Sequence, residues 1–257
     1  MWPSSILPST RIWPQRSSST PFRTISTGGT ALRKYSFHGT SHTFVASEAA
    51  RYLGRDLGEL NLMNRPPGKR GEYKCHPRRG VCGYEHGNDP LEGLMMGTRS
   101  GDVDPAVPLF MVLELGMDPS GIYKLLNGES GLKGICGQND MREVLRLKSR
   151  GDRMAEFAFR MYCYRVKKYI GAYMAVLSSV DALVFTAGIG ENSPELRWHV
   201  CEGLEKLGVR IDSGRNNRNE REISCPDSPV RVLVIRTNEE LMIARETVRV
   251  TGLRPVL

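Results

Sequence analysis

Two short stretches combine residue types that can hold a phosphate group. His38 and His42 flank Gly-Thr-Ser at the start of an expected helix, where an imidazole can face an anion that the helix end also attracts. Further on, Gly97 and Gly101 flank Arg99, which is typical of a tight loop that projects a guanidinium toward phosphate oxygens. The plainer alternatives are two capping or core histidines and a surface loop with one solvated arginine.

A third stretch, VFTAGIGENSPELR, places two glycines between an apolar run and an expected helix. Gly188 and Gly190 follow the run, and Pro194 opens the helix. Glycine lets a ligand approach the backbone closely, and a helix start offers free N–H groups. The pattern favours a nucleotide-binding corner, although an ordinary strand-to-helix turn also favours glycine.

A fourth group of residues has metal-ligand types but the wrong spacing. Cys75, His76, Cys82 and His86 lie within a basic stretch, yet they lack the C-x₂-C pair that is typical of a zinc site. The chain has six cysteines in 257 residues, which is too few for a disulfide scaffold and indicates a reduced compartment. We therefore expect no structural zinc.

The elements that must position these residues alternate between helices and strands. Apolar periodicity and Asp, Pro and Gly punctuation predict helices over 39–54, 104–116, 118–128, 139–152, 152–179, 194–207 and 238–250. Two short apolar runs, 181–188 and 229–237, predict buried strands. Helices alternating with strands indicate an α/β fold with a mixed or mostly parallel sheet.

The net charge of +8 is confined to two unusual stretches. Residues 1–47 carry +5 and residues 64–87 carry +4, so the remainder sums to −1. This distribution weakens the nucleic-acid partner that a basic chain otherwise suggests. The chain contains no apolar run of about 18 residues, so we expect no membrane span. The first 31 residues are rich in Ser, Thr, Pro and Arg, a composition that predicts irregular structure, with a transit peptide as the alternative.

Five strings in one order resemble the acetate kinase family. They are RKYSFHGTSH, PLEGLMMGTRSGDVDPA, NDMREV, LVFTAGIGENSPELR and VIRTNEELMIARET, and together they span roughly Leu32 to Thr247. The resemblance implies an actin-like ATPase fold of the ribonuclease H-like type, incomplete here, with a mixed sheet flanked by helices. It implies that 32–257 is the C-terminal nucleotide-binding domain, and that the preceding domain of the family lies outside this sequence.

The resemblance also implies an activity and its residues. The activity is reversible phosphoryl transfer between ATP and acetate, giving ADP and acetyl phosphate, with Mg²⁺, in a cytoplasmic homodimer. His38 and Arg99 are then the catalytic residues, and Glu239 is the magnesium-associated carboxylate. The implied nucleotide contacts are Asp140, Met141 and Arg142 in one turn and Gly188, Ile189, Gly190, Glu191 and Asn192 in the adenosine-side loop.

The stretch between Asn64 and Asp89 departs from the family pattern. The family carries a phosphate-binding segment resembling AHLGNGAS…GG…VDTSMG, whereas this sequence reads RPPGKRGEY…RRGVCGYEHG. Synonymous codons for this stretch, read one base later, translate as AHLGNGASIN and then AIRGGVCVDTSMG. We therefore hypothesise that residues 64–89 are translated out of frame between two compensating one-base changes, either sequencing or gene-model errors or real lesions.

This hypothesis leaves two readings of the function. One is an acetate kinase phosphotransferase. The alternative is a catalytically inactive nucleotide-binding fragment, or the product of a pseudogene or of an erroneous gene model. We also expect the altered stretch to leave a cavity or an exposed edge where the family sheet has strands.

Overall fold

The computed structural model describes residues 39–65, 74–76, 83–84 and 91–252. Among these residues the helices are α2 (Gly39–Leu53), η2 (Leu57–Glu59), α3 (Ala106–Leu113), α4 (Pro119–Gly128), α5 (Gly131–Cys136), α6 (Met141–Ser149), α7 (Arg153–Leu177), α8 (Ala187–Asn192), α9 (Pro194–Cys201), η3 (Glu205–Leu207), α10 (Ser213–Asn217) and α11 (Glu239–Thr251). The strands are β1 (Leu62–Arg65), β2 (Lys74–His76), β3 (Gly83–Tyr84), β4 (Ala182–Phe185) and β5 (Arg231–Val234).

The strands form one mixed sheet in the order β3-β2-β1-β4-β5. β1, β4 and β5 are parallel: Met63 pairs with Leu183, which pairs in turn with Val232. β2 is antiparallel to β1, and β3 is antiparallel to β2. The prediction of an α/β fold with a mixed sheet is confirmed.

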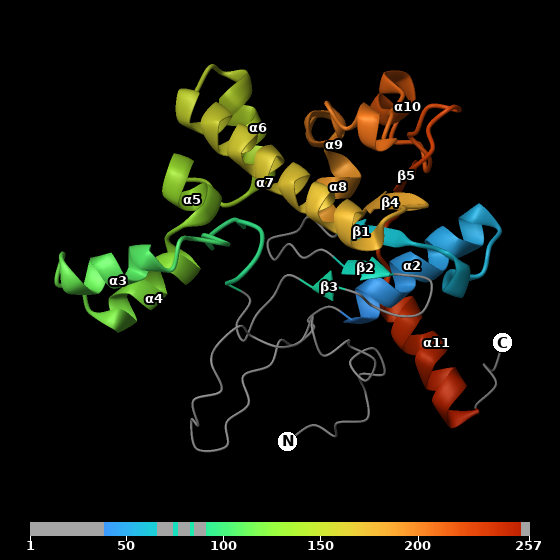
Figure 1. Cartoon of the computed structure of the whole chain (residues 1–257), viewed down its shortest axis with the longest axis horizontal. Coiled ribbons are helices and arrows are strands. Elements are labelled where there is room, and N and C mark those ends of the chain that lie inside the picture. Colours follow the sequence, from blue (N-terminus) through green and yellow to red (C-terminus); the bar gives the residue numbers. More distant parts are fainter. Residues whose placement is uncertain (1–38, 66–73, 77–82, 85–90, 253–257) are drawn as a thin grey trace.

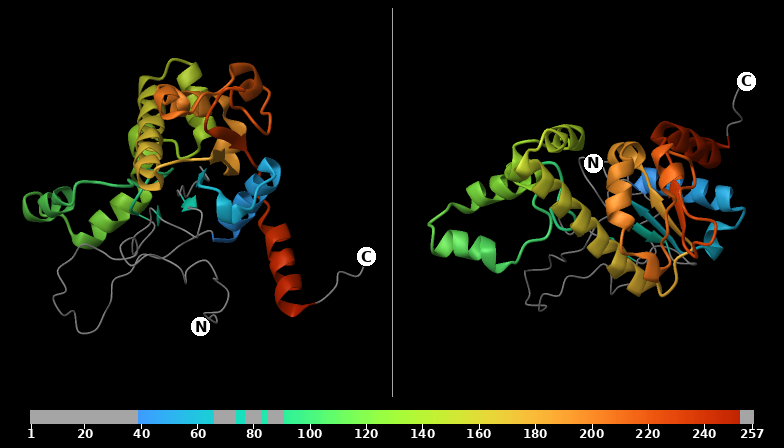
Figure 2. Two further views of the ribbon diagram at one scale, coloured as in Figure 1. Left: turned by 45° about the vertical axis from the view of Figure 1, so that its right-hand side comes forward. Right: turned by 90° about the horizontal axis from the view of Figure 1, so that it is seen from above.

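Helices cover both faces of the sheet (Figures 1 and 2). α2 and α11 pack on one face, and α7 with α9 packs on the other. α5 packs beside the part of α7 that is distant from the sheet, and α3 and α4 lie further out still (Figure 1). The long helix α7 therefore joins the sheet to this outlying group.

Apolar side chains that alternate between the two faces of the sheet explain why helices pack on both faces. Leu62, Ala182, Val184 and Leu233 share one buried cluster with α2 and α11. The residues between them in the strands belong to the cluster built on α7 and α9, namely Met63, Leu183, Phe185 and Val232. Side chains alternate between faces at a period of two, so each face receives every second apolar residue.

Polar caps set the starts of α4, α6, α7 and α9. The carboxylates of Asp118, Asp140 and Asp152 accept hydrogen bonds from backbone N–H groups in the first turns of α4, α6 and α7. Ser193 caps α9 with Pro194 as its first residue. These caps satisfy N–H groups that have no partner inside the helix.

One expectation for the fold is wrong. The helix expected over 194–207 ends at Cys201, because Gly203 adopts a φ of 80° that an α-helix cannot continue. Within the stretch from Asn64 to Asp89, where a cavity or an exposed edge is expected, β2 and β3 extend the sheet beyond β1, and β3 is the outer strand of the described sheet. No helix within the described ranges has the length and apolar character to cross a bilayer.

Candidate functional site

The starts of α2 and α11 meet at the carboxyl edge of the parallel strands. The Ser41 hydroxyl, in the first turn of α2, donates a hydrogen bond to the carboxylate of Glu239, the first residue of α11. At the end of β1, the Asn64 side-chain amide donates to the carbonyl of His42 over 3.1 Å. Glu239, predicted from the sequence as the magnesium-associated residue, therefore lies beside the helix that His38 precedes. His38 itself is outside the described residues.

The end of α8 reaches the same edge from β4. Glu191 accepts a hydrogen bond through Oε1 from the backbone N–H of Thr237, over 3.1 Å, in the loop between β5 and α11. Glu191 and Asn192 also line a cavity of about 380 Å³. The other lining residues are Phe44, Glu48, Asn219, Arg221, Val234, Ile235 and Arg236.

The glycine corner forms a short helix, α8, between β4 and α9, where the sequence predicted a turn from strand to helix. Ala187 begins α8 with a φ of 56°, whereas Gly188 has ordinary helical backbone. Among the described residues, no atom lies within 4 Å of the position that a Cβ on Gly188 would take. Neither its backbone conformation nor packing against the described part of the chain therefore requires a glycine at 188. Ile189 packs against the α7-side core, and Gly190 is buried.

The Arg99 loop docks on the turn that carries Asp140. A Cβ on Gly97 would lie 2.5 Å from the carbonyl oxygen of Asn139, so only glycine permits this approach. The Arg99 Nε–H donates to Asn127 Oδ1 over 3.2 Å, and the Arg99 carbonyl accepts from Met96 N–H over 2.9 Å. Two predicted site segments that are 41 positions apart in the sequence thus lie side by side.

Asp140 and Arg142 form a paired group at the start of α6. The Asp140 carboxylate accepts from the Arg142 backbone N–H over 2.9 Å and from its guanidinium over 3.1 and 2.6 Å. This hydrogen bonding raises the pKa of Arg142. Arg142 is exposed, whereas Met141 is buried in the core. The side chains that this turn offers to a ligand are therefore those of Asp140 and Arg142.

An ion-pair group ties α6 to α9, which follows α8. Lys148 Nζ lies 2.8 Å from Glu195 Oε1 and 3.2 Å from Glu156 Oε2. The hydrogen bond from Lys148 to Glu195 is the main cause that raises the pKa of the Lys148 ammonium. The element that carries Asp140 is thereby held against the element that follows Gly188.

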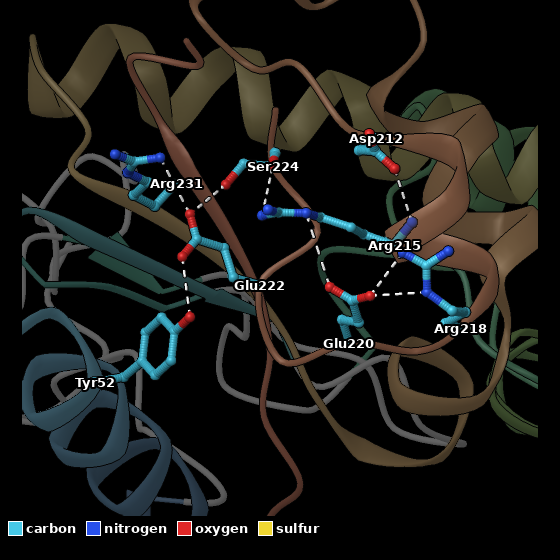
Figure 3. Close-up of polar contacts among 8 residues, drawn as sticks. All are labelled: Tyr52, Asp212, Arg215, Arg218, Glu220, Glu222, Ser224 and Arg231. Atoms are coloured by element: carbon cyan, nitrogen blue, oxygen red, sulfur yellow. Dashed lines mark hydrogen bonds and ion pairs between the residues drawn. The ribbon is translucent and has the colours of Figure 1, made fainter. Parts of the chain in front are cut away.

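A second polar network includes Glu220 and Glu222, the sequence neighbours of the cavity-lining Arg221 (Figure 3). The Glu222 carboxylate accepts from Tyr52 Oη over 3.0 Å, from Ser224 Oγ over 2.8 Å and from Arg231 over 3.2 Å. Nearby, Glu220 pairs with Arg218 and Arg215, whose backbone N–H is capped by Asp212 (Figure 3). The sequence carries no signal for this network, because its members follow no recognisable motif.

The described residues contain no group of three or more His, Cys, Asp or Glu side chains placed to hold a metal ion. Of the four considered for zinc, Cys75 and His76 lie in β2, and Cys82 and His86 are outside the described residues. Glu239 and the Ser41 hydroxyl offer one carboxylate and one hydroxyl oxygen side by side. That set fits Mg²⁺, which binds through one or two carboxylates together with substrate phosphates.

Comparison with known proteins shows the family to which this chain belongs. Residues 18–245 match the acetokinase family. The chain belongs to this family. It is similar to an acetate kinase of Coprothermobacter proteolyticus, 51% identical over 220 residues, which are 84% of this chain and 55% of that protein. A second relative, an acetate kinase of Nitratidesulfovibrio vulgaris, is 48% identical over 223 residues, or 85% of this chain and 55% of its own length.

Solved structures of acetokinase family members have the same fold. The acetate kinase of Porphyromonas gingivalis superposes with a TM-score of 0.89 at 38% identity, covering 93% of this chain and 61% of that one. A propionate kinase of Francisella tularensis gives 0.85 at 38% identity, covering 91% and 60%. The chain thus has the predicted actin-like ATPase fold, and it spans about half the length of the curated relatives it matches.

Proposed function

We propose that this chain provides the nucleotide-binding part of an acetate kinase, which transfers the terminal phosphoryl group of ATP to acetate. One observation carries the proposal: Ser41, Glu239 and Glu191 join α2, α11 and α8 at the carboxyl edge of the parallel strands. In open α/β sheets this edge is where ligands bind. The position of Glu239 and Glu191, two of the residues predicted for the site, at this edge supports the proposal.

In the proposed reaction an acetate oxygen bonds to the terminal phosphorus while the bond from that phosphorus to the ADP oxygen breaks. Such a transition state spreads negative charge over three phosphoryl oxygens, so catalysis depends on positioned cations and hydrogen-bond donors. Arg99 is proposed to supply a guanidinium from its docked loop, and His38 an imidazole from the start of α2. Bound Mg²⁺, held by Glu239, would neutralise phosphate charge.

The nucleotide is proposed to lie across α8 and the start of α6. The bare backbone at Gly188 lets the adenosine approach closely, and Asn192 is held by its own hydrogen bond to the Gly188 carbonyl over 2.8 Å. Asp140 and Arg142 are proposed to face the same ligand from α6, which the Lys148–Glu195 pair holds nearby. From the family resemblance alone we further propose a cytoplasmic homodimer.

A second candidate is a nucleotide-binding chain without phosphoryl transfer. The altered composition of residues 64–89 favours it, because Lys69 and Arg70 stand where the family has Asn and Gly beside phosphate. A lysine is a mobile point charge and does not replace the backbone donors of a glycine loop. We expect the chain as written to bind nucleotide and to form no acyl phosphate above background.

Calorimetric titration with Mg·ATP, paired with an acyl phosphate assay, tests both candidates. The chain should bind Mg·ATP saturably, and Glu239→Gln should weaken binding in Mg²⁺ by about tenfold, the loss expected from removing one charged contact of about 1.4 kcal/mol. Glu240→Gln is the matched control, since Glu240 is the exposed neighbour in the same helix turn. Absence of saturable binding would refute nucleotide binding, and clear turnover would refute the inactive reading.

A further inference from the structure

Arg197, in α9, is a fully buried arginine whose guanidinium is bonded to uncharged oxygens. Its Nε–H donates to Asn216 Oδ1 over 2.8 Å. One terminal nitrogen donates to the carbonyls of Gly190 and Glu191 over 2.7 and 3.0 Å. The other donates to the Asn216 carbonyl over 3.0 Å and to Asn219 Oδ1 over 2.5 Å. These contacts account for the five N–H donors of a guanidinium.

Burial of this cation is costly. Desolvation lowers the pKa of Arg197 to about 10, a value at which the side chain is still charged at neutral pH. A buried charge is tolerated when every donor is hydrogen-bonded, but apolar residues of similar volume often stabilise a core as well or better. The arginine therefore calls for an explanation other than general stability.

The contacts of Arg197 join two segments that flank the site. The carbonyls of Gly190 and Glu191 lie at the end of α8, where helical carbonyls lack intrahelical partners and the dipole is negative. Asn216 and Asn219 belong to the segment around α10. α8 has six residues, too few for a helix to be stable without tertiary contacts.

The start of α8 adds strain that these contacts must offset. Ala187 holds a φ of 56°, a conformation that costs an L-residue with a Cβ free energy and persists only where its surroundings enforce it. From the other side, Glu191 is fixed by its side-chain bond to Thr237. Arg197 is the cation at the centre of the contacts that enforce this corner.

We propose that Arg197 is a positioning residue for the nucleotide: its guanidinium clamps the end of α8 to Asn216 and Asn219, and so holds Gly188 and Asn192 at the ligand. The role rests on the proposed nucleotide-binding function, but the clamp itself is a property of the ligand-free chain. The clamp and its effect on nucleotide binding can therefore be measured separately.

The first measurement is amide hydrogen exchange of the ligand-free full chain. Arg197→Lys removes the planar fork, and Asn219→Gly removes one acceptor at a position whose φ of 53° glycine adopts freely. Both variants should speed exchange in peptides spanning 186–196 by about tenfold while α7 keeps its parental rates. Arg218→Lys is the control, since Arg218 is exposed and its guanidinium pairs with Glu220.

The second measurement is Mg·ATP binding by calorimetry, with a rescue variant. Arg197→Lys and Asn219→Gly should each weaken binding by several-fold, and Ala187→Gly placed in the Arg197→Lys background should recover part of the affinity. The rescue is expected because glycine relieves the strain at 187 that the clamp offsets. A residue of merely general structural importance would show no such rescue.

The outcomes separate the clamp from the nucleotide proposal. Unchanged exchange over 186–196 in both variants, or a uniform rise across all peptides, overturns the clamp. If Arg197→Lys does not fold, Asn219→Gly decides the same point. If the parent chain does not bind Mg·ATP, the proposed function fails, and the exchange comparison alone decides the clamp.

Discussion

Ala187 and Gly188 each adopt the backbone conformation that the other residue type favours. Ala187 holds a φ of 56°, where glycine is normally found, and Gly188 has helical backbone where alanine is favoured. A Cβ at 188 would meet nothing within 4 Å. The proposed explanation is that a ligand occupies this space when it is bound.

Gly188→Ala should accordingly move stability and binding in opposite directions. We expect the free energy of unfolding to stay level or rise by up to about 1 kcal/mol, because alanine is the better helix former, while Mg·ATP binding weakens. Gly171→Ala is the matched control, since Gly171 also lies in a helix with nothing within 4 Å of its Cβ position. Equal binding by both variants, measured by calorimetry, would argue against a ligand at Gly188.

Phe159 joins three helices in the core on the α7 side. It is fully buried, its ring meets His199 edge-on with centroids 5.4 Å apart, and Lys148 Nζ lies 5.3 Å from its centroid. Phe159→Ala should lower the free energy of unfolding by about 3–5 kcal/mol. Phe157→Ala, two residues away and half exposed, should change it by about 0.5 kcal/mol or less. Urea denaturation of both variants gives the comparison, and similar losses would contradict the described core.

The Tyr52–Glu222 hydrogen bond predicts a loss of stability in alkali. Burial, followed by the hydrogen bond to Glu222, raises the pKa of Tyr52 from its ordinary value of 10.0. Above pH 10 the folded state therefore holds this proton more tightly than the unfolded state, and stability from this group falls as pH rises.

Tyr52→Phe should cost about 0.5 kcal/mol near neutral pH and show a shallower decline above the ordinary tyrosine pKa. Tyr164→Phe, at an exposed position of α7, is the control. Unfolding free energies measured across the alkaline range test this. A decline as steep in Tyr52→Phe as in the parent would show that the hydrogen bond does not contribute.

The out-of-frame hypothesis predicts a specific nucleotide sequence. Coding DNA for residues 64–89 should contain, one base later, codons that translate to the glycine-rich segment of acetate kinases. Sequencing genomic DNA and transcript across this region decides it. Codons that cannot yield the segment in the shifted frame would end the hypothesis. Related genomes that encode the same altered stretch in one continuous frame would also count against it.

Local signals in the sequence predicted the elements with strong punctuation. Asp118, Asp140 and Asp152 cap helices as their positions indicated, and β4 and β5 lie within the two apolar runs. Caps and buried apolar runs depend on neighbouring residues alone, so a single sequence carries them.

Elements that depend on tertiary contacts were missed. α5, α8 and α10 have five or six residues, too few to show a helical period. α9 was predicted too long because apolar Leu204 and Leu207 continue its pattern past Gly203. β1 went unrecognised because Leu62 and Met63 are a short apolar pair next to the altered stretch.

In the candidate site, too, features set by neighbouring residues were predicted and features set by tertiary contacts were not. The segments around Arg99, Asp140, Gly188 and Glu239 were predicted, because each lies in a contiguous motif. Their arrangement depends on single contacts that no motif records, such as the approach of Gly97 to Asn139. The buried Arg197 and the cavity-lining Asn219 and Arg221 gave no sequence signal, since their partners are dispersed along the chain.

Photoaffinity labelling with an azidoadenine analogue of ATP, in the presence of Mg²⁺, tests the central claim most directly. If the nucleotide lies across α8 and the start of α6, cross-links should appear in peptides that contain Asp140–Arg142 and Gly188–Asn192, each suppressed by excess ATP. Cross-links that ATP suppresses only in other peptides, or labelling that ATP does not suppress at all, would contradict it.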